Sequence, residues 1–166
     1  MTVDSLSQRL SFAPVVDGDF EAMLALRIDA MRPSLERVGR FDLTRARERL
    51  VQGFVPEHMQ HILWDGERIG FVTLKPEGTQ MLRLDHLYLR HGFHGMGIGT
   101  AVLQWAQERA RARGLGIKLT ALKLSDANRF YLRHGFVLEG EEDMDVHYRW
   151  QGLGVVPLAS TIFVSA

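Results

Sequence analysis

A glycine-rich loop is the segment whose residue types and spacing most directly suggest chemistry. Its residues are His94, Gly95, Met96, Gly97, Ile98, Gly99 and Thr100. Glycines let a backbone approach a ligand closely, and the free N–H groups and dipole of a helix N-terminus attract an anion. Because helix-forming residues follow at once, the loop predicts a phosphate or pyrophosphate site on the backbone of residues 95–100.

Two familiar nucleotide-binding motifs do not fit this loop. A Rossmann fingerprint needs Gly-x-Gly-x-x-Gly and an acidic residue about 20 positions later. The glycines here are spaced Gly-x-Gly-x-Gly, and residues 115–118 hold no acid. A Walker loop needs Gly-Lys-Ser/Thr, which the chain lacks. Neither motif therefore assigns the anion.

The strand expected just before the loop changes the phase of its apolar pattern. Leu82 and Leu84 occupy even positions, whereas Leu87 and Leu89 occupy odd ones, so the change falls between residues 85 and 86. One inserted residue, a β-bulge, produces such a change, although a strand buried on both faces gives the same pattern. A bulge leaves backbone polar groups unpaired, and something must satisfy them.

At these residues the sequence resembles the GNAT superfamily of acetyl-CoA-dependent N-acetyltransferases. The loop of that family reads Gln/Arg-x-x-Gly-x-Gly/Ala at the start of a helix, and the match begins at His94 with Gly97 and Gly99 in the glycine positions. The resemblance is close over residues 82–150 and loose over the N-terminal half.

A second block, residues 125–136, is similar to the second signature of the family, in which a tyrosine precedes a Gly-Phe pair. Tyr131 is that tyrosine. Two positions depart from the pattern, since His94 stands where Gln or Arg is usual and Leu124 stands where Asn is frequent. Asn128 could supply the contact to pantetheine that Leu124 cannot make.

The resemblance implies a fold and a reaction. The fold is α/β (α+β), with a mixed, mainly antiparallel central sheet that is split at a bulged strand and flanked by about four helices. The reaction is direct attack of a primary amine on the thioester of acetyl-CoA, through a tetrahedral intermediate. The implied contacts with acetyl-CoA are made by Leu87, Tyr88, Leu89, His94, Gly95, Met96, Gly97, Ile98, Gly99, Thr100, Asn128 and Tyr131.

Three side chains are candidates for proton transfer. As in the family, Tyr131 is expected to protonate the departing thiolate, while the Leu89 N–H stabilises the thioester oxygen. Asp85 and His86 are the nearest candidates for the base that deprotonates the amine, directly or through a water molecule. A purely structural role is the alternative for each of the three side chains.

Periodicity and turn signals predict the elements that position these residues. Helices are expected at residues 20–31, 43–54, 99–113 and 126–134. Strands are expected at residues 10–16, 60–64, 68–74, 81–89, 117–122, 136–142 and 145–150. Arg32-Pro33 is expected to end the first helix, because the residue before a proline avoids the helical region. Asp65-Gly66 predicts a tight hairpin turn.

Composition sets the broad class. The chain has 166 residues, 46% of them hydrophobic, which predicts a single domain over residues 1–150 with a C-terminal extension at residues 151–166. The absence of cysteine excludes disulfides and thiolate chemistry, and no metal site is predicted. The N-terminus has no signal-peptide pattern and no apolar run is long enough to span a membrane, so the cytoplasm is the expected location.

The net charge and the distribution of charged residues indicate which partners to expect. Twenty basic residues balance twenty acidic ones, so neither nucleic acid nor a membrane surface is an expected partner. Residues 90–133 hold eight basic against two acidic side chains, which suits the phosphates of CoA. The expected acceptor is a small-molecule or peptide amine, with Arg32, Arg37, Arg40 and Phe41 as candidates to line its pocket. The C-terminal extension could pair across a homodimer.

Two other functions remain open at this point. A non-catalytic acetyl-CoA-binding sensor or partner module is suggested by the departures at His94 and Leu124. A generic nucleotide binder would explain the loop without the family.

Overall fold

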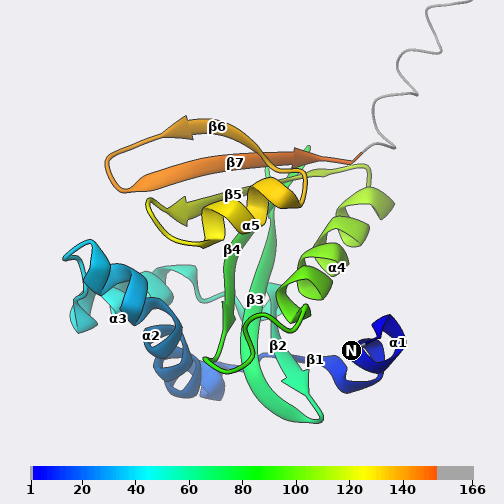
Figure 1. Ribbon diagram of the computed structural model, residues 1–166, viewed down its shortest axis with the longest axis horizontal. Helices are drawn as coiled ribbons and strands as arrows, with labels where there is room; N and C mark the ends of the chain where they lie inside the picture. Colours follow the sequence, from blue (N-terminus) through cyan, green and yellow to red (C-terminus); the bar gives the residue numbers. More distant parts are fainter. Residues whose placement is uncertain (1, 153–166) are drawn as a thin grey trace, which may run out of the picture. The chain divides into compact units, whose positions relative to one another are not determined.

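The computed structural model describes residues 2–152, which form both helices and strands (Figure 1). The helices and single 3₁₀ turns are α1 (Val3–Arg9), η1 (Asp17–Asp19), α2 (Phe20–Arg37), α3 (Leu43–Gly53), η2 (Pro56–His58), α4 (Ile98–Ala112) and α5 (Ala127–Arg133). The strands are β1 (Leu10–Pro14), β2 (Met59–Trp64), β3 (Glu67–Glu77), β4 (Met81–Leu89), β5 (Gly116–Leu122), β6 (Val137–Glu141) and β7 (Asp145–Gln151).

Seven strands hydrogen-bond in the order β1-β2-β3-β4-β5-β7-β6. Strands β4 and β5 are parallel, whereas β1 with β2, β2 with β3, β5 with β7 and β6 with β7 are antiparallel. The predicted fold class, a mixed and mainly antiparallel sheet flanked by helices, is thereby confirmed. No helix within residues 2–152 has the length and apolarity needed to cross a membrane.

The chain divides into two compact units. The first holds residues 2–74 and 85–101, and the second holds residues 75–84 and 102–152. Strand β4 passes from one unit to the other after Leu84, and its pairing with β5 ends at the same residue, opposite Leu119. The residues of β4 after Leu84 therefore have no hydrogen-bond ladder to β5.

The alternation of buried and half-buried residues along strand β4 is interrupted near its end. The alternation of Leu82 and Leu84 continues to His86, which is 7% exposed, and the next buried residue is Leu89. The phase therefore changes after His86, not before it, and the predicted position was wrong. The reason is that the apolar pattern counts His86 as an outward polar residue, whereas the structure buries its side chain.

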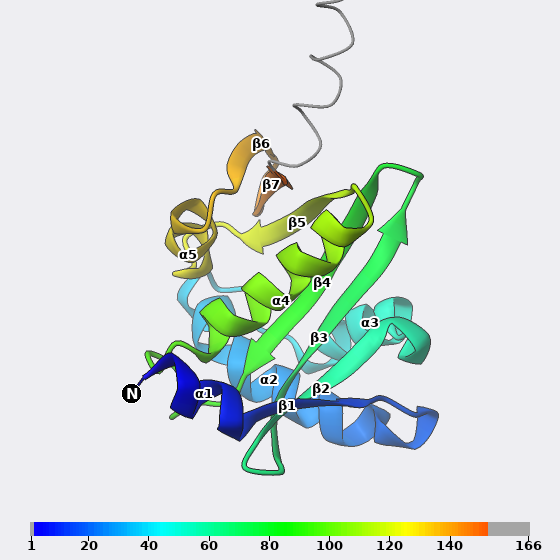
Figure 2. The ribbon, with the colours of Figure 1, turned by 90° about the vertical axis from the view of Figure 1, so that its right-hand side faces the viewer.

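In the first unit, β1, β2 and β3 lie side by side, and α2 and α3 lie on one face of them (Figure 2). The predicted Asp65-Gly66 turn is confirmed, because both residues have positive φ angles (51° and 83°), as a type I′ turn requires. The core of this unit joins both helices to the strands through Val15, Met23, Leu24, Leu50, Met59 and Phe71.

Helix α2 does not end before Pro33, and that prediction was wrong. It continues through the proline to Arg37. A proline inside a helix lacks the N–H that would bind the carbonyl four residues earlier, here the carbonyl of Asp29. His91 of the loop after β4 satisfies this carbonyl, since its Nε2 lies 3.0 Å from Asp29 O. The Asp29 carbonyl is thus bound by a residue far away in the sequence, which a rule based on neighbouring residues does not consider.

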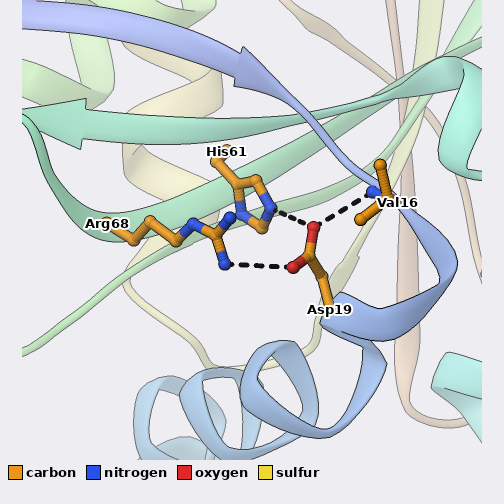
Figure 3. Close-up of polar contacts among 4 residues, drawn as sticks. All are labelled: Val16, Asp19, His61 and Arg68. Atoms are coloured by element: carbon orange, nitrogen blue, oxygen red, sulfur yellow. Dashed lines mark hydrogen bonds and ion pairs between the residues drawn. The ribbon is translucent and has the colours of Figure 1, made fainter.

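The carboxylate of Asp19 fixes the start of α2 to the strands (Figure 3). Its Oδ2 accepts the Val16 N–H at 3.0 Å and lies 2.8 Å from His61 Nε2, and its Oδ1 accepts from Arg68 Nη1 at 3.1 Å. The hydrogen bond from the Val16 backbone, followed by those from His61 and Arg68, lowers the pKa of Asp19 from 3.8 to about 2. The carboxylate therefore stays ionised across the physiological range.

In the second unit, β5 lies between the first half of β4 and the whole length of β7. Gly116 is required where β5 begins, because a Cβ there would lie 2.8 Å from Trp150 O and 2.9 Å from Met81 Sδ. Helices α4 and α5 are joined by Gln107, whose Nε2 donates to His134 O at 3.0 Å.

The N-terminal helix α1 was not predicted. It is short and is capped by Thr2, whose hydroxyl accepts the Ser5 N–H at 3.4 Å. Of the predicted C-terminal extension, residues 153–166 lie outside the described part of the chain.

Candidate functional site

The glycine-rich loop presents a row of backbone donors at the start of α4. Gly95 and Gly97 have φ angles of +76° and +84°, which glycine adopts without strain. The first bond of the helix runs from the Ala101 N–H to Gly97 O at 3.1 Å. From residue 94 to residue 100, no backbone N–H has a partner within residues 2–152. With the dipole of a helix that extends from Ile98 to Ala112, these donors can hold an anion.

Side chains around the loop leave its backbone accessible. Gly95 and Gly97 are exposed, and Met96, Gly99 and Thr100 are half-buried. Ile98 is fully buried and anchors the first turn of α4. A Cβ on Gly95 would meet no atom within 4 Å, so the space beside Gly95 is open, whereas a Cβ on Gly97 would lie 3.4 Å from Leu6 Cδ1.

His94 binds the backbone of β4. Its Nε2 lies 3.0 Å from the carbonyl oxygen of Leu89, and because a carbonyl can only accept, Nε2 carries the proton. The His94 side chain therefore supports the strand end, and its expected contact with acetyl-CoA stays a prediction. Its ring also stacks on that of His91, with centroids 5.8 Å apart.

The Leu89 N–H faces the edge of β4 that β5 has left. The next N–H along the strand, that of Arg90, donates to Ile69 O of β3 at 2.8 Å. Successive residues of a strand direct their N–H groups to opposite edges, so the Leu89 N–H points away from β3. It lies beyond the last β4–β5 pair, Leu84 with Leu119. The expected role of the Leu89 N–H as a donor to the thioester oxygen stays a prediction.

The two candidate bases differ in environment. Asp85 is half-buried. His86 is buried and packs against α3, since a Cβ on Gly53 would lie 2.8 Å from His86 Nε2. Its ring lies 5.9 Å from that of Phe71 and 5.6 Å from that of Tyr88. Leu87 and Tyr88 are half-buried on the same strand.

Tyr131 lies in an aromatic cluster of the second unit. It is 9% exposed, and its ring centroid is 5.3 Å from Phe130, 5.5 Å from Phe136 and 6.2 Å from Tyr148. Its backbone carbonyl accepts the N–H groups of His134 and Phe136, which ends α5. The ring is therefore packed among other aromatic rings, and its role as a proton donor stays a prediction.

Asn128 uses its side-chain amide to hold the turn between β5 and α5. Its Nδ2 donates to Leu122 O at 3.0 Å and to Ser125 O at 2.9 Å, and its Oδ1 accepts from the Tyr148 hydroxyl at 2.7 Å. Burial raises the pKa of Tyr148, and the Glu141 carboxylate raises it further, so this phenol stays a donor. The predicted contact of Asn128 with pantetheine would have to use the second lone pair of Oδ1.

The candidate acceptor residues at the end of α2 pack on one another. Arg32 lies over the ring of Phe41 at 4.5 Å and pairs with Glu36 at 2.9 Å. The Arg40 N–H donates to Leu35 O at 2.8 Å. These contacts give the residues a local structural role, and lining of an acceptor pocket stays a prediction.

Sequence reasoning missed one residue of this region, Arg27 of α2. It falls on the apolar face of the helix, at helical spacing from Met23 and Leu24, and it is 5% exposed. A charge inside an apolar stripe is the signal that could have found it. Within residues 2–152 no group of three or more His, Cys, Asp or Glu residues is placed to hold a metal ion.

Comparison with known proteins assigns the chain to a family. Residues 21–136 match the model of the acetyltransferase (GNAT) family. An aminoalkylphosphonate N-acetyltransferase of Salmonella typhimurium is 35% identical over 92 residues, which is 52% of this chain. The match covers 49% of the relative, so the chain spans about half its length.

Solved structures share the fold at low sequence identity. A PaiA N-acetyltransferase of Thermoplasma acidophilum in complex with coenzyme A has a TM-score of 0.71 at 16% identity, over 86% of this chain and 99% of that one. An acetyltransferase of Thermus thermophilus has a TM-score of 0.68 at 18% identity, over 87% and 97%. With the family model matching most of the chain, this protein belongs to the acetyltransferase (GNAT) family.

Proposed function

We propose that this chain is an N-acetyltransferase that transfers the acetyl group of acetyl-CoA to a primary amine. The observation that carries the proposal is the row of backbone N–H groups at residues 94–100, without partners in residues 2–152, at the N-terminus of α4. Such a row suits a pyrophosphate, which CoA contains. The Salmonella relative, named for N-acetylation of aminoalkylphosphonates, and the Thermoplasma structure with coenzyme A support the proposal.

In the proposed reaction the amine nitrogen attacks the thioester carbonyl carbon directly. A C–N bond forms and the C–S bond breaks, and the Leu89 N–H donates to the carbonyl oxygen while that oxygen carries negative charge. The proton lost by the amine passes to Asp85 or His86, directly or through water.

Tyr131 then protonates the thiolate of CoA in this scheme. A free thiol has a pKa near 8.5 and a free phenol a pKa near 10, so the transfer is uphill by about 2 kcal/mol. A cost of this size is compatible with turnover, because it is small beside the barriers that enzymes lower.

Calorimetric titration with acetyl-CoA, ATP and NAD tests the binding half of the proposal. We expect micromolar affinity for acetyl-CoA and none for ATP or NAD. Gly97→Glu should abolish binding, because it puts a carboxylate and a side chain where φ is +84°. Gly114→Glu is the matched control, since Gly114 also has a positive φ (66°) but lies after the opposite end of α4.

A panel of small-molecule and peptide amines tests the catalytic half. Acetylated amine and free CoA should appear in equal amounts. Tight binding of acetyl-CoA without turnover of any amine would identify a non-catalytic module instead. Equal competition by ATP or NAD would identify a generic nucleotide binder.

A further inference from the structure

Arg27 is a buried cation without a carboxylate partner. It is 5% exposed, its Nη1 donates to Ala46 O of α3 at 3.1 Å, and its Nε is buried without a partner. No acidic side chain within residues 2–152 forms an ion pair with it. One side of the guanidinium is thus held by α3, and the Nε–Nη2 side has no protein acceptor.

Burial of the Arg27 guanidinium lowers the stability of the fold unless an anion binds to it. An arginine in a protein cannot lose its proton, so burial cannot be offset by neutralisation as it can for lysine. The ring of Tyr88, 5.6 Å from the guanidinium carbon, offers a cation–π contact but no counter-charge. The Nε–H and Nη2–H donors are parallel and match two oxygens of a carboxylate or phosphonate.

The position of Arg27 connects it with the reacting strand. Tyr88, which its guanidinium contacts, is the neighbour of Leu89 in β4. The ring of His86, one of the candidate bases, lies 5.6 Å from the ring of Tyr88. Helices α2 and α3, which hold Arg27, therefore cover the face of β4 on which Tyr88 and His86 lie.

We propose that the acceptor is an amine that also carries an acidic group, and that Arg27 binds this group through Nε and Nη2. The proposal rests on the proposed acetyl transfer, and it deepens that function by naming the substrate class. A carboxylate and a phosphonate offer the same pair of oxygens, so the experiment includes both.

The test compares acidic amines with neutral partners of the same length. The probes are glycine, β-alanine and 4-aminobutyrate with their amides, and aminomethyl-, 2-aminoethyl- and 3-aminopropylphosphonate with the corresponding alkylamines. The proteins are the wild type, Arg27→Met and Arg47→Met. Arg47 is the matched control, because it also lies 5.6 Å from an aromatic ring, that of Phe20, but is half-exposed and paired with Glu21.

We expect the wild type to prefer at least one acidic amine over its neutral partner by about 30- to 100-fold in kcat/KM, the effect of a buried charge pair. Arg27→Met should abolish this preference and leave kcat/KM for the neutral amine within about threefold, and Arg47→Met should keep the preference. The thermal midpoint of Arg27→Met should equal or exceed that of the wild type, because an uncompensated buried charge is removed.

Contrary results separate the two proposals. Equal use of acidic and neutral amines, or a loss in Arg27→Met that is the same for both and accompanied by a lower thermal midpoint, overturns the role of Arg27 alone. If no amine is acetylated, the proposed function fails, and calorimetry decides the inference. Binding of β-alanine or 3-aminopropylphosphonate that Arg27→Met abolishes supports an anion site, and no binding to the wild type overturns it.

Discussion

The carboxylate of Asp19 should make the stability of this protein depend on pH in a defined window. Hydrogen bonds from the Val16 backbone, His61 and Arg68 lower its pKa from 3.8 to about 2 (Figure 3). A pKa shift of one unit is worth about 1.4 kcal/mol, so the ionised carboxylate contributes about 2 kcal/mol to the free energy of unfolding. The Asp19 side chain is 12% exposed and His61 is buried, whereas Arg68 is about half-exposed, so solvent screens the contact with Arg68 more than that with His61.

The sign follows from the direction of the shift. A lowered pKa means that the folded protein binds the Asp19 proton less readily than the unfolded chain does. The contribution is complete above pH 3.8, declines as the pH falls, and is lost below about pH 2. Asp19→Asn should therefore lower the free energy of unfolding by about 2 kcal/mol at pH 7 and by much less at pH 2.5.

Urea unfolding at pH 7, 4, 3 and 2.5 measures this difference between the wild type and Asp19→Asn. Asp65→Asn is the control, because Asp65 pairs with Arg9 at the surface, where both side chains are about half-exposed. We expect a much smaller effect from Asp65→Asn, and one that salt screens. A difference for Asp19→Asn that stays constant with pH, or that equals the difference for Asp65→Asn, would refute the reasoning.

Three further predictions concern the residues around the site. Leu124→Asn should raise the free energy of unfolding, measured in urea, by about 1 kcal/mol. Leu124 is exposed and has a φ of +69°, which asparagine tolerates better than leucine, so a lower urea midpoint would contradict this prediction. Tyr131→Phe should lower kcat by about 100-fold or more while the Kd for acetyl-CoA stays unchanged, since only the proton donor is lost; unchanged turnover would remove Tyr131 from the mechanism. His94→Ala should lower kcat by about tenfold and change the Kd by less than about threefold, because the bond to Leu89 O positions the strand end. A reversed split between kcat and Kd would show that His94 binds the phosphates.

Much of the fold follows from local patterns. The Asp65-Gly66 turn was predictable because only residues that tolerate positive φ angles form a type I′ turn. The end of α2 was not, because the proline rule is local and His91, 62 residues after Asp29, supplies the donor that the Asp29 carbonyl lacks. Helix α1 was missed because a helix of seven residues has little periodicity to detect.

The predictability of the site divides in the same way. The anion loop was predictable because its glycines and the helix that follows are contiguous in the sequence. The burial of His86 was not predictable, since it depends on space left by Gly53 of another element. Arg27 was missed because a search for apolar periodicity ignores a charged residue at a core position. A buried charge in an apolar stripe is nevertheless the feature of α2 that points most directly to a binding site.

His94 departs from the family's loop pattern, and its side chain binds a backbone carbonyl beside the loop. Two backbone carbonyls near the loop lack their usual partners: that of Asp29, because Pro33 has no N–H, and that of Leu89, because β5 has separated from β4. His91 and His94 satisfy one carbonyl each, both through Nε2 at 3.0 Å. The two imidazoles thus occupy both carbonyls, and within residues 2–152 the backbone N–H groups of residues 94–100 have no partner, as the proposed phosphate site requires.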